Sequence, residues 1–214
     1  SEVHAIIPYY SFGRSDKKDA PRISITARLV ADLLKTSGAT HVMSMMFHSP
    51  QVHGFFAMPT DPLSARPVFK DYLDTRDLTD HIVVAPDMGS AKSAARFAKS
   101  LELPIAAGNK ERVSDSQVKI SGLAGNQVRG HKHALIYDDE IATGGSIDEL
   151  SRVLIAEGIE DITVVCTHGV FTRGGLERLA AIPQIREIVT TDTVYIPPER
   201  RHPKLKVLSV APIF

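Results

Sequence analysis

The sequence predicts an α/β fold built on mainly parallel sheets. Short apolar runs that suit buried strands alternate with segments whose apolar residues recur at helical spacing. A polar or acidic loop separates each run from the following helix, which is the order of the strand-loop-helix units of parallel sheets. Both halves of the 214-residue chain show this rhythm. Two related α/β domains are therefore expected.

The first half is predicted to hold two strands with a helix between them. The strands are expected over residues 3–8, which should be buried, and over residues 41–47. The helix is expected over residues 24–36, with an apolar face formed by Ile25, Leu29, Val30, Leu33 and Leu34. Residues 60–80 carry prolines and many charges and are expected to join the halves, with a helix near residues 68–73.

The second half is predicted to continue the alternation. Strands are expected over residues 81–85, 104–107, 133–137, 161–167, 186–191 and 205–211. Helices are expected over residues 90–101, 147–157 and 174–181. Residues 108–116 contain a single apolar side chain and are predicted to form a mobile loop. The prolines of residues 195–202 argue against regular structure there.

The composition excludes several classes of protein. The formal net charge of +0 argues against a general nucleic-acid binder, which normally carries a basic excess. No apolar run approaches the roughly 18 residues that span a bilayer, and no signal-peptide pattern opens the sequence, so an intracellular protein is expected. The single cysteine, Cys166, lies in an apolar run and is expected to be a core residue. The sequence starts at Ser1 and enters an apolar stretch almost at once, which suggests entry into a domain already under way.

Residues 133–146 are the stretch with the clearest chemistry. An apolar strand leads to acidic residues, a glycine-rich turn and a helix start, and the N–H groups of such a turn bind anions. Glycines let the backbone approach a phosphate, hydroxyls add donors, and carboxylates accept hydrogen bonds from sugar hydroxyls. The groups in question are Asp138, Asp139, Thr143, Gly144, Gly145 and Ser146. The alternative is an ordinary strand-loop-helix with an Asp cap and a glycine turn; two acids and two hydroxyls in this order favour a ribose-phosphate site.

This stretch resembles the ribose-phosphate loop of the type I phosphoribosyltransferase superfamily. That superfamily includes nucleobase phosphoribosyltransferases and ribose-phosphate pyrophosphokinases. Two further segments, residues 7–18 (IPYYSFGRSDKK) and 48–59 (HSPQVHGFFAMP), are similar to ribose-phosphate pyrophosphokinases and have no counterpart in the nucleobase enzymes. The resemblance covers essentially the whole chain.

The resemblance implies two phosphoribosyltransferase-like domains, each a mainly parallel sheet flanked by helices. Residues 1–62 would be the remainder of an N-terminal domain, residues 63–198 a C-terminal domain with the ribose-phosphate loop, and residues 199–214 a terminal strand and tail. The first domain is expected to be incomplete, because a substantial N-terminal portion of the family's chain has no counterpart here. An exposed sheet edge or a partner chain would follow.

The resemblance also implies an activity and a set of site residues. The family transfers the diphosphoryl group of Mg-ATP to the 1-hydroxyl of ribose 5-phosphate, giving PRPP and AMP. By position, the catalytic cations would be Lys110 and Arg112, and the magnesium ligands His48 and Asp87. Contacts to ATP would come from Arg14, Ser15 and Asp16. Contacts to ribose 5-phosphate would come from Asp138, Asp139, Ala142, Thr143, Gly144, Gly145 and Ser146. A cytoplasmic homo-oligomer, dimer or hexamer, is implied, with no nucleic-acid or membrane partner.

Two of these assignments have a physical argument besides the resemblance. Ligands of α/β sheets gather at the carboxyl ends of the strands, so Asp87 and residues 138–146 should face one crevice. Lys110 and Arg112, two positions apart on a loop, could close over a polyphosphate and stabilise its charge. Taken alone, that loop reads as an exposed segment with incidental charges, and His48 as a surface histidine. The resemblance instead favours a catalytic role for the loop cations and a magnesium-binding role for His48.

Four departures from the family pattern keep other functions open. Ser15 stands where the family has Gln, Met46 where it has Asp, and Ala142 where many members have Asp. The fourth is the missing N-terminal portion. The alternatives are a diverged pyrophosphokinase acting on another ribose 5-phosphate derivative, a non-catalytic regulatory homologue and, less favoured, a nucleobase phosphoribosyltransferase.

Overall fold

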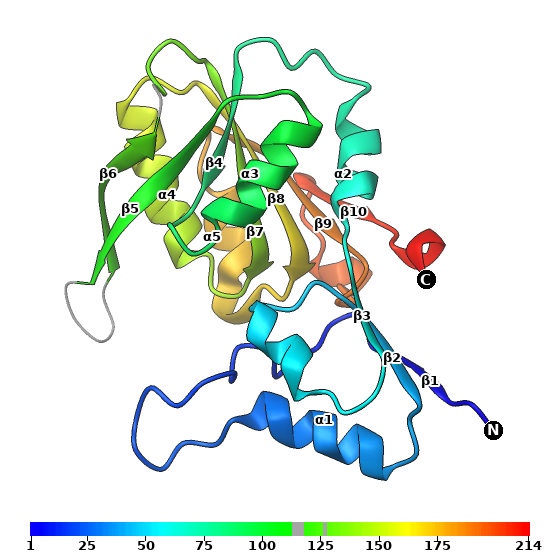
Figure 1. Cartoon of the computed structure of the whole chain (residues 1–214). Helices are drawn as coiled ribbons and strands as arrows, with labels where there is room; N and C mark the ends of the chain where they lie inside the picture. The colour runs from blue at the N-terminus through cyan, green and yellow to red at the C-terminus, as the bar shows by residue number, and fades with distance from the viewer. Residues whose placement is uncertain (113–117, 126–127) are drawn as a thin grey trace. The chain divides into compact units, whose positions relative to one another are not determined.

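The chain forms two compact units (Figure 1). The computed structural model describes residues 1–112, 118–125 and 128–214. One unit contains Ser1–Ala65 together with Val210–Phe214, and the other contains Arg66–Ser209. Within the described ranges, no helix has both the length and the apolar character needed to cross a membrane.

The first unit is built on a small parallel sheet. Its three strands, β1 (His4–Ile6), β2 (His41–Met45) and β3 (Thr60–Leu63), lie in the order β1-β2-β3. Helix α1 (Thr26–Thr36) connects β1 to β2, and the 3-10 helix η1 (Pro50–Phe55) connects β2 to β3. Strand β3 was not predicted, because Pro62 and its polar neighbours read as a junction. As an edge strand of this sheet, β3 tolerates a proline.

An aromatic cluster fills the space between α1 and the loops of the first unit. The ring of Tyr10 lies 5.6 Å from that of Phe47 and 5.4 Å from that of Phe56, centroid to centroid. The buried Tyr10 hydroxyl donates a 2.7 Å hydrogen bond to the carbonyl of Ala27. Burial raises the pKa of Tyr10 to about 12. The loop after β1 is therefore fastened to the helix that follows it.

Two predictions for the first unit are wrong in detail. The strand expected over residues 3–8 is shorter, and its His4 and Ile6 are exposed, because β1 is an edge of the described sheet. The expected apolar face of α1 is only partly covered: Leu29 and Leu33 are about half exposed, and the helix buries Ala27 and Ala31 instead.

The second unit is a seven-stranded sheet with the order β10-β9-β8-β7-β4-β5-β6. Its strands are β4 (His81–Ala85), β5 (Ile105–Arg112), β6 (Val118–Gly125), β7 (His133–Ile141), β8 (Asp161–Gly169), β9 (Ile185–Thr191) and β10 (Leu205–Leu208). Every pairing is parallel except that of β5 with β6. The predicted α/β fold with a mainly parallel sheet is confirmed.

Helices cover both faces of this sheet (Figure 1). They are α2 (Arg66–Leu73), α3 (Ala91–Ser100), α4 (Gly145–Ala156) and α5 (Gly175–Ala180). On one face the apolar sides of α4 and α5 pack on alternate residues of the strands, including Ile136 and Cys166. On the other face the ring of Tyr137 stacks on Phe97 of α3 at 4.3 Å and meets Phe69 of α2 edge-on at 6.3 Å. Neighbours in a strand point to opposite faces, so Ile136 and Tyr137 fill different layers of the core.

Cys166 is a core residue, as predicted. Its side chain is fully buried and its thiol donates to the hydroxyl of Thr190 at 3.4 Å. Burial raises the pKa of the Cys166 thiol to about 12, which keeps it protonated and unreactive at neutral pH.

The edge of the sheet differs from the prediction at residues 108–112. These residues continue β5 and pair in antiparallel fashion with β6, where a loop was expected. Backbone hydrogen bonds between strands do not depend on apolar side chains, so a polar stretch can form a hairpin that hydrophobic periodicity does not reveal. The remainder of the predicted loop, residues 113–116, lies outside the described residues.

The carboxyl-terminal segments differ from the prediction in two ways: the proline-rich stretch is more regular, and the last strand is shorter than the expected residues 205–211. The proline-rich stretch contains the short 3-10 helix η3 (Pro198–Arg200), and the last strand ends at Leu208. A further 3-10 turn, η4 (Ala211–Ile213), follows β10 within the stretch that groups with the first unit.

Candidate functional site

The junction between β7 and α4 presents hydrogen-bond donors that the described chain leaves unused. Gly144 precedes the helix in the left-handed conformation, with φ of 73°, and no side chain caps the helix start. The N–H groups of a first helical turn have no partner within the helix. Among the described residues, the hydroxyls of Thr143 and Ser146 make no hydrogen bond, and the Thr143 side chain is exposed. This is an arrangement that favours an anion.

Close packing against α5 fixes this junction. A Cβ on Gly144 would lie 3.1 Å from Cγ of Leu179, and one on Gly175 would lie 2.5 Å from the carbonyl oxygen of Ala142. Arg178 donates from Nη1 to the carbonyl of Thr143 at 3.1 Å. The sequence did not reveal that Gly175 and Arg178 contact this turn. The glycine pair that opens α5 was the available signal for a close backbone approach.

The two glycines of the turn therefore differ. Gly144 needs its positive φ and its missing Cβ for the fold itself. Gly145 does not: a Cβ there would meet only the hydroxyl of Thr143, at an ordinary 3.8 Å. A requirement for glycine at position 145 would come from whatever approaches the turn.

The acids before the turn lie inside β7, not after it. The prediction ended this strand at residue 137, but β7 runs to Ile141. Asp138 therefore faces the same side as Ile136, and Asp139 the same side as Tyr137. Pairing continues because the backbone of Asp138 still has β8 as a neighbour, opposite Cys166.

Asp138 lies partly buried among other acids. Its Oδ1 accepts a 2.9 Å hydrogen bond from the backbone N–H of Asp139. The pKa of Asp138 is nevertheless raised well above its ordinary value, first because burial disfavours the carboxylate and then because Asp139 and Asp87 add like charge. The structure thus brings Asp87 within electrostatic range of Asp138, as expected for residues at the carboxyl ends of neighbouring strands.

Asp87 orders the turn that precedes α3. Its Oδ1 accepts a 3.0 Å hydrogen bond from the backbone N–H of Ser90, and the Ser90 hydroxyl donates to the Asp87 carbonyl at 3.1 Å. This carboxylate has two tasks: it orders the local turn, and it contributes charge to the neighbouring acid.

The two cations assigned to catalysis lie on the edge hairpin. Lys110 and Arg112 are the sixth and eighth residues of β5, opposite Ile120 and Val118 of β6. The pairing changes register between Asn109 and Lys110.

The segments assigned to ATP and to His48 meet within the first unit. A Cβ on Gly13 would lie 3.9 Å from Cβ of His48, and the hydroxyl of Ser49 donates to Oδ2 of Asp16 at 2.5 Å. Ser15 holds the start of α1: its hydroxyl donates to the Ser24 carbonyl at 2.9 Å and accepts from the N–H of Thr26 at 3.2 Å. Serine at this position thus has a structural use.

Most of the candidate metal ligands are carboxylates. In the portion of the chain that the structure describes, no three or more His, Cys, Asp or Glu side chains are arranged as a metal cluster. The carboxylate oxygens of Asp87, Asp138 and Asp139 are nevertheless of the type that Mg²⁺ prefers. Burial raises the pKa of Asp138 and the like charge of Asp139 and Asp87 raises it further, so a neighbouring cation would favour its carboxylate form. In ligand type these residues fit magnesium. His48 belongs to the first unit and Asp87 to the second, so neither unit by itself contains the pair.

Comparisons with known proteins identify the family of this chain. The family model described as the N-terminal domain of ribose phosphate pyrophosphokinase matches residues 1–38. The ribose-phosphate pyrophosphokinase of Deinococcus radiodurans is 46% identical over 217 residues, which cover 99% of this chain and 67% of that protein. The chain belongs to the ribose-phosphate pyrophosphokinase family.

Further similarities extend over nearly the whole chain. A putative ribose-phosphate pyrophosphokinase of Streptomyces coelicolor is 47% identical over 210 residues, covering 98% of this chain and 66% of that protein. The crystal structure of phosphoribosylpyrophosphate synthetase from Mycobacterium smegmatis superimposes with a TM-score of 0.89 at 37% identity, over 99% of this chain and 68% of that one. The chain spans about two thirds of the length of these ribose-phosphate pyrophosphokinases.

Proposed function

We propose that this chain takes part in ribose-phosphate diphosphokinase chemistry. The diphosphoryl group of ATP would pass to the 1-hydroxyl of ribose 5-phosphate: the new P–O bond forms at the β-phosphorus as the bond to the α-phosphate breaks. The products are PRPP, AMP and the proton of the hydroxyl. The observation that carries this proposal is the β7–α4 junction, where an uncapped helix start and two unused hydroxyls follow a pair of acids.

Ribose 5-phosphate would be held at this junction. The first-turn N–H groups of α4 and the hydroxyls of Thr143 and Ser146 would bind the 5-phosphate. The positive φ of Gly144 turns the chain so that these donors converge, while Gly145 leaves room for the phosphate. Ala142 would contribute backbone only. Asp138 and Asp139 would accept hydrogen bonds from the ribose hydroxyls or share a second magnesium ion.

Phosphoryl transfer asks for alignment and for positive charge around the migrating oxygens. Lys110 and Arg112 would supply that charge from β5, which lies beside β4 in the sheet. Carboxylate oxygens of Asp87 and its acidic neighbours, with His48, would hold Mg²⁺, which neutralises phosphate charge in such reactions. Contacts to ATP would come from Arg14, Ser15 and Asp16.

Three other features implied by the family resemblance are also proposals. Residues 1–62 and 63–198 would be two phosphoribosyltransferase-like domains, with residues 199–214 as a terminal strand and tail. The native assembly would be a homo-oligomer, and its location the cytoplasm. The family relationship supports all three.

The proposal is tested by AMP formation from Mg-ATP with and without ribose 5-phosphate. AMP that forms only with ribose 5-phosphate is the expected result. Lys110→Ala should lower turnover by roughly 10²–10³-fold while ribose 5-phosphate still binds, because a cation that acts on the transferred phosphates leaves the acceptor site intact. Lys99→Ala, an exposed cation at the end of α3, is the matched control and should keep full activity.

Two results would contradict the proposal. Saturable binding of ribose 5-phosphate without any AMP would favour the regulatory homologue, once restoring upstream residues also failed to give turnover. Equal turnover by Lys110→Ala and Lys99→Ala would remove Lys110 from the reaction.

A further inference from the structure

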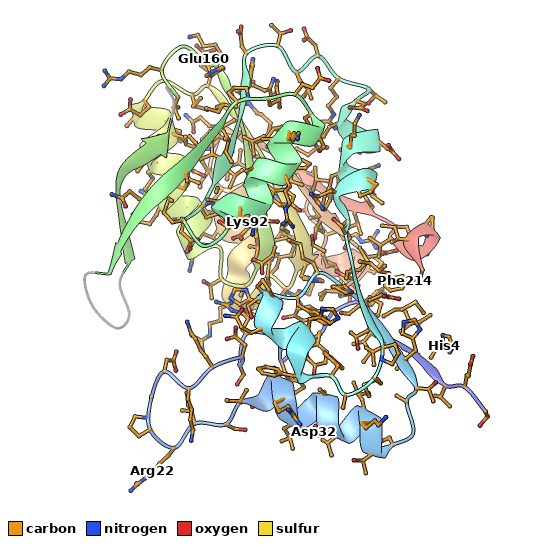
Figure 2. The ribbon with its side chains drawn as sticks, in the orientation of Figure 1. His4, Arg22, Asp32, Lys92, Glu160 and Phe214 are labelled. Atoms are coloured by element: carbon orange, nitrogen blue, oxygen red, sulfur yellow. The ribbon has the colours of Figure 1, made fainter. Side chains whose placement is uncertain are left out.

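Two histidines meet at the amino ends of the first unit's strands. His4 is the first residue of β1 and His41 the first residue of β2, and the two are paired in register. Asp61 lies next to them, near the start of β3. Figure 2 labels His4 on its strand. Ligands of parallel sheets collect at the carboxyl ends of the strands, so this cluster lies at the opposite edge from that expected for a substrate.

The two imidazoles face each other through the same ring atom. Nδ1 of His4 and Nδ1 of His41 are 3.3 Å apart, while the ring centroids are 5.0 Å apart. Nε2 of His41 lies 2.8 Å from Oδ2 of Asp61, and Nε2 of His4 lies 3.5 Å from Oε2 of Glu2. Each ring thus has a carboxylate behind it and the other ring in front.

The hydrogen bond to Asp61 assigns the proton of neutral His41. A carboxylate only accepts hydrogen bonds, so Nε2 of His41 is the donor and its Nδ1 is a lone pair. Nδ1 of His4 lies 3.3 Å from this lone pair and carries the hydrogen of that contact in the metal-free chain. Replacing this hydrogen with a cation leaves two lone pairs at ligand distance.

A tetrahedral metal ion matches the gap. Zn²⁺ binds imidazole nitrogen at about 2.0–2.1 Å, so two nitrogens on one tetrahedral ion lie roughly 3.3 Å apart. Metal-bound histidines commonly donate their other N–H to a carboxylate, which orients the ring and strengthens the ligand. Asp61 and Glu2 occupy that position behind His41 and His4.

Neighbouring hydrogen bonds hold the two strands in place before any ligand arrives. The backbone N–H of Val3 donates to the Thr40 hydroxyl at 2.8 Å, and the Thr40 N–H donates to the Val3 carbonyl at 2.9 Å. The residues just before each histidine are therefore tied together. Solvent reaches the rings, since the His4 side chain is 47% exposed and that of His41 22%.

We propose that His4 and His41 bind a divalent transition-metal ion of the zinc class through their Nδ1 atoms, with Asp61 and Glu2 supporting the rings. Water completes the coordination, which agrees with the described residues containing no group of three or more protein ligands. Imidazole nitrogen favours Zn²⁺, Ni²⁺ and Cu²⁺ over Mg²⁺, so the site is chemically distinct from the carboxylates of the second unit. A bound ion would join edge strand β1 to β2 and stabilise the first unit.

The test is a Zn²⁺ titration of the metal-free, untagged chain in millimolar Mg²⁺, followed by calorimetry. One saturable Zn²⁺ site is expected, together with a rise in Tm. His4→Ala should weaken Zn²⁺ binding by at least about tenfold to a hundredfold, the loss seen when even a supporting partner of a metal ligand is removed. Asp61→Asn should weaken binding by roughly tenfold for the same reason. His53→Ala, an exposed histidine of the same unit, is the matched control and should bind as the unaltered chain does.

A second measurement does not require any variant to fold. Long-range ¹H–¹⁵N spectra of the metal-free chain should show the Nε2–H tautomer for His41 and the Nδ1–H tautomer for His4, and Zn²⁺ should convert His4 to Nε2–H and shift both Nδ1 signals. Equal Zn²⁺ affinity of His4→Ala and His53→Ala overturns the proposal. So does an Nδ1–H tautomer at either ring in the Zn²⁺-bound chain, or the absence of saturable binding.

Discussion

Two strand-to-helix junctions of the second unit look alike in sequence but differ in how their polar groups are used. Each has an acid near the carboxyl end of a parallel strand and small residues at the start of a helix. At β4–α3, Asp87 and Ser90 satisfy each other through hydrogen bonds of 3.0 and 3.1 Å. Neither helix start has a side-chain cap, but at β7–α4 the hydroxyls of Thr143 and Ser146 have no partner among the described residues.

The difference shows which junction is built for a ligand. The Ser90 hydroxyl is already hydrogen-bonded, whereas the hydroxyls of Thr143 and Ser146 stay available to an anion beside the uncapped first turn of α4. The acids reinforce the contrast, because burial and the like charge of Asp139 and Asp87 raise the pKa of Asp138 and disfavour its carboxylate form. Such unfavourable arrangements are typical of functional sites.

The largest effect is expected from adding a side chain at Gly175, where α5 packs closely against the β7–α4 junction. A Cβ at Gly175 would lie 2.5 Å from the carbonyl oxygen of Ala142, so Gly175→Ala must displace the turn. We expect a loss of about 1–3 kcal/mol in the free energy of unfolding and weaker binding of ribose 5-phosphate. Thermal denaturation and calorimetric titration measure the two effects.

Gly145→Ala is the control for that substitution. Its Cβ fits at 3.8 Å from the nearest side-chain atom, so Tm should stay close to that of the unaltered chain while ribose 5-phosphate binding weakens. If Gly175→Ala left both stability and binding unchanged, the contact between α5 and the turn would have no part in shaping the site.

The next largest effects are expected from removing the hydroxyl of Ser146 or that of Ser90. Ser146→Ala removes an unused donor, so we expect about tenfold weaker ribose 5-phosphate binding, the low end for a hydrogen bond to a charged group, and an unchanged Tm. Ser90→Ala removes a hydrogen-bonded side chain and should cost about 1 kcal/mol of stability with binding retained. Loss of stability in Ser146→Ala, or loss of binding in Ser90→Ala alone, would reverse the comparison.

A smaller effect, and one of opposite sign, is expected at Asp138. Because the pKa of Asp138 is raised in the folded state, its ionisation favours unfolding at any pH above the ordinary aspartate pKa, and fully so above the raised value. Asp138→Asn keeps the Oδ1 acceptor for the N–H of Asp139 and removes the charge. We expect Tm to rise by about 2–4 °C at neutral pH, the shift that roughly 1 kcal/mol gives in a chain of this size.

The sign of the Asp138 effect can be followed with pH. The gain should shrink as the pH falls toward the ordinary pKa range of aspartate, where Asp138 is protonated in the folded and unfolded states alike. A Tm that drops at neutral pH in Asp138→Asn would mean that the carboxylate stabilises the fold.

Most of the fold and part of the site could be predicted from the sequence. Strand β4 and helix α2 were predicted closely because apolar periodicity and turn residues mark them locally. The hairpin of β5 and β6 was not, since backbone pairing at a sheet edge leaves no apolar pattern. The continuation of β7 through Asp138 and Asp139 was missed for the same reason: its neighbour β8, not its own side chains, keeps it extended.

Contacts between residues far apart in the chain were the second kind of feature that the sequence did not reveal. The ribose-phosphate turn was identified from its glycines and hydroxyls, which are adjacent in the chain. Gly175 and Arg178 act on it from more than 30 residues away and only become visible when α5 is packed against the turn. The pairing of His4 with His41 likewise depends on the register of β1 and β2.

The central claim, that the β7–α4 junction and not the β4–α3 junction receives the phosphate, is tested most directly by amide chemical shifts. Ribose 5-phosphate titrated into the ¹⁵N-labelled chain should move the backbone N–H signals of Gly145, Ser146 and Ile147 most. The N–H signals of Ser90 and Ala91 at the start of α3 should move little. Shifts that concentrate at Ser90 and Ala91, or a titration that moves neither set, would contradict the account.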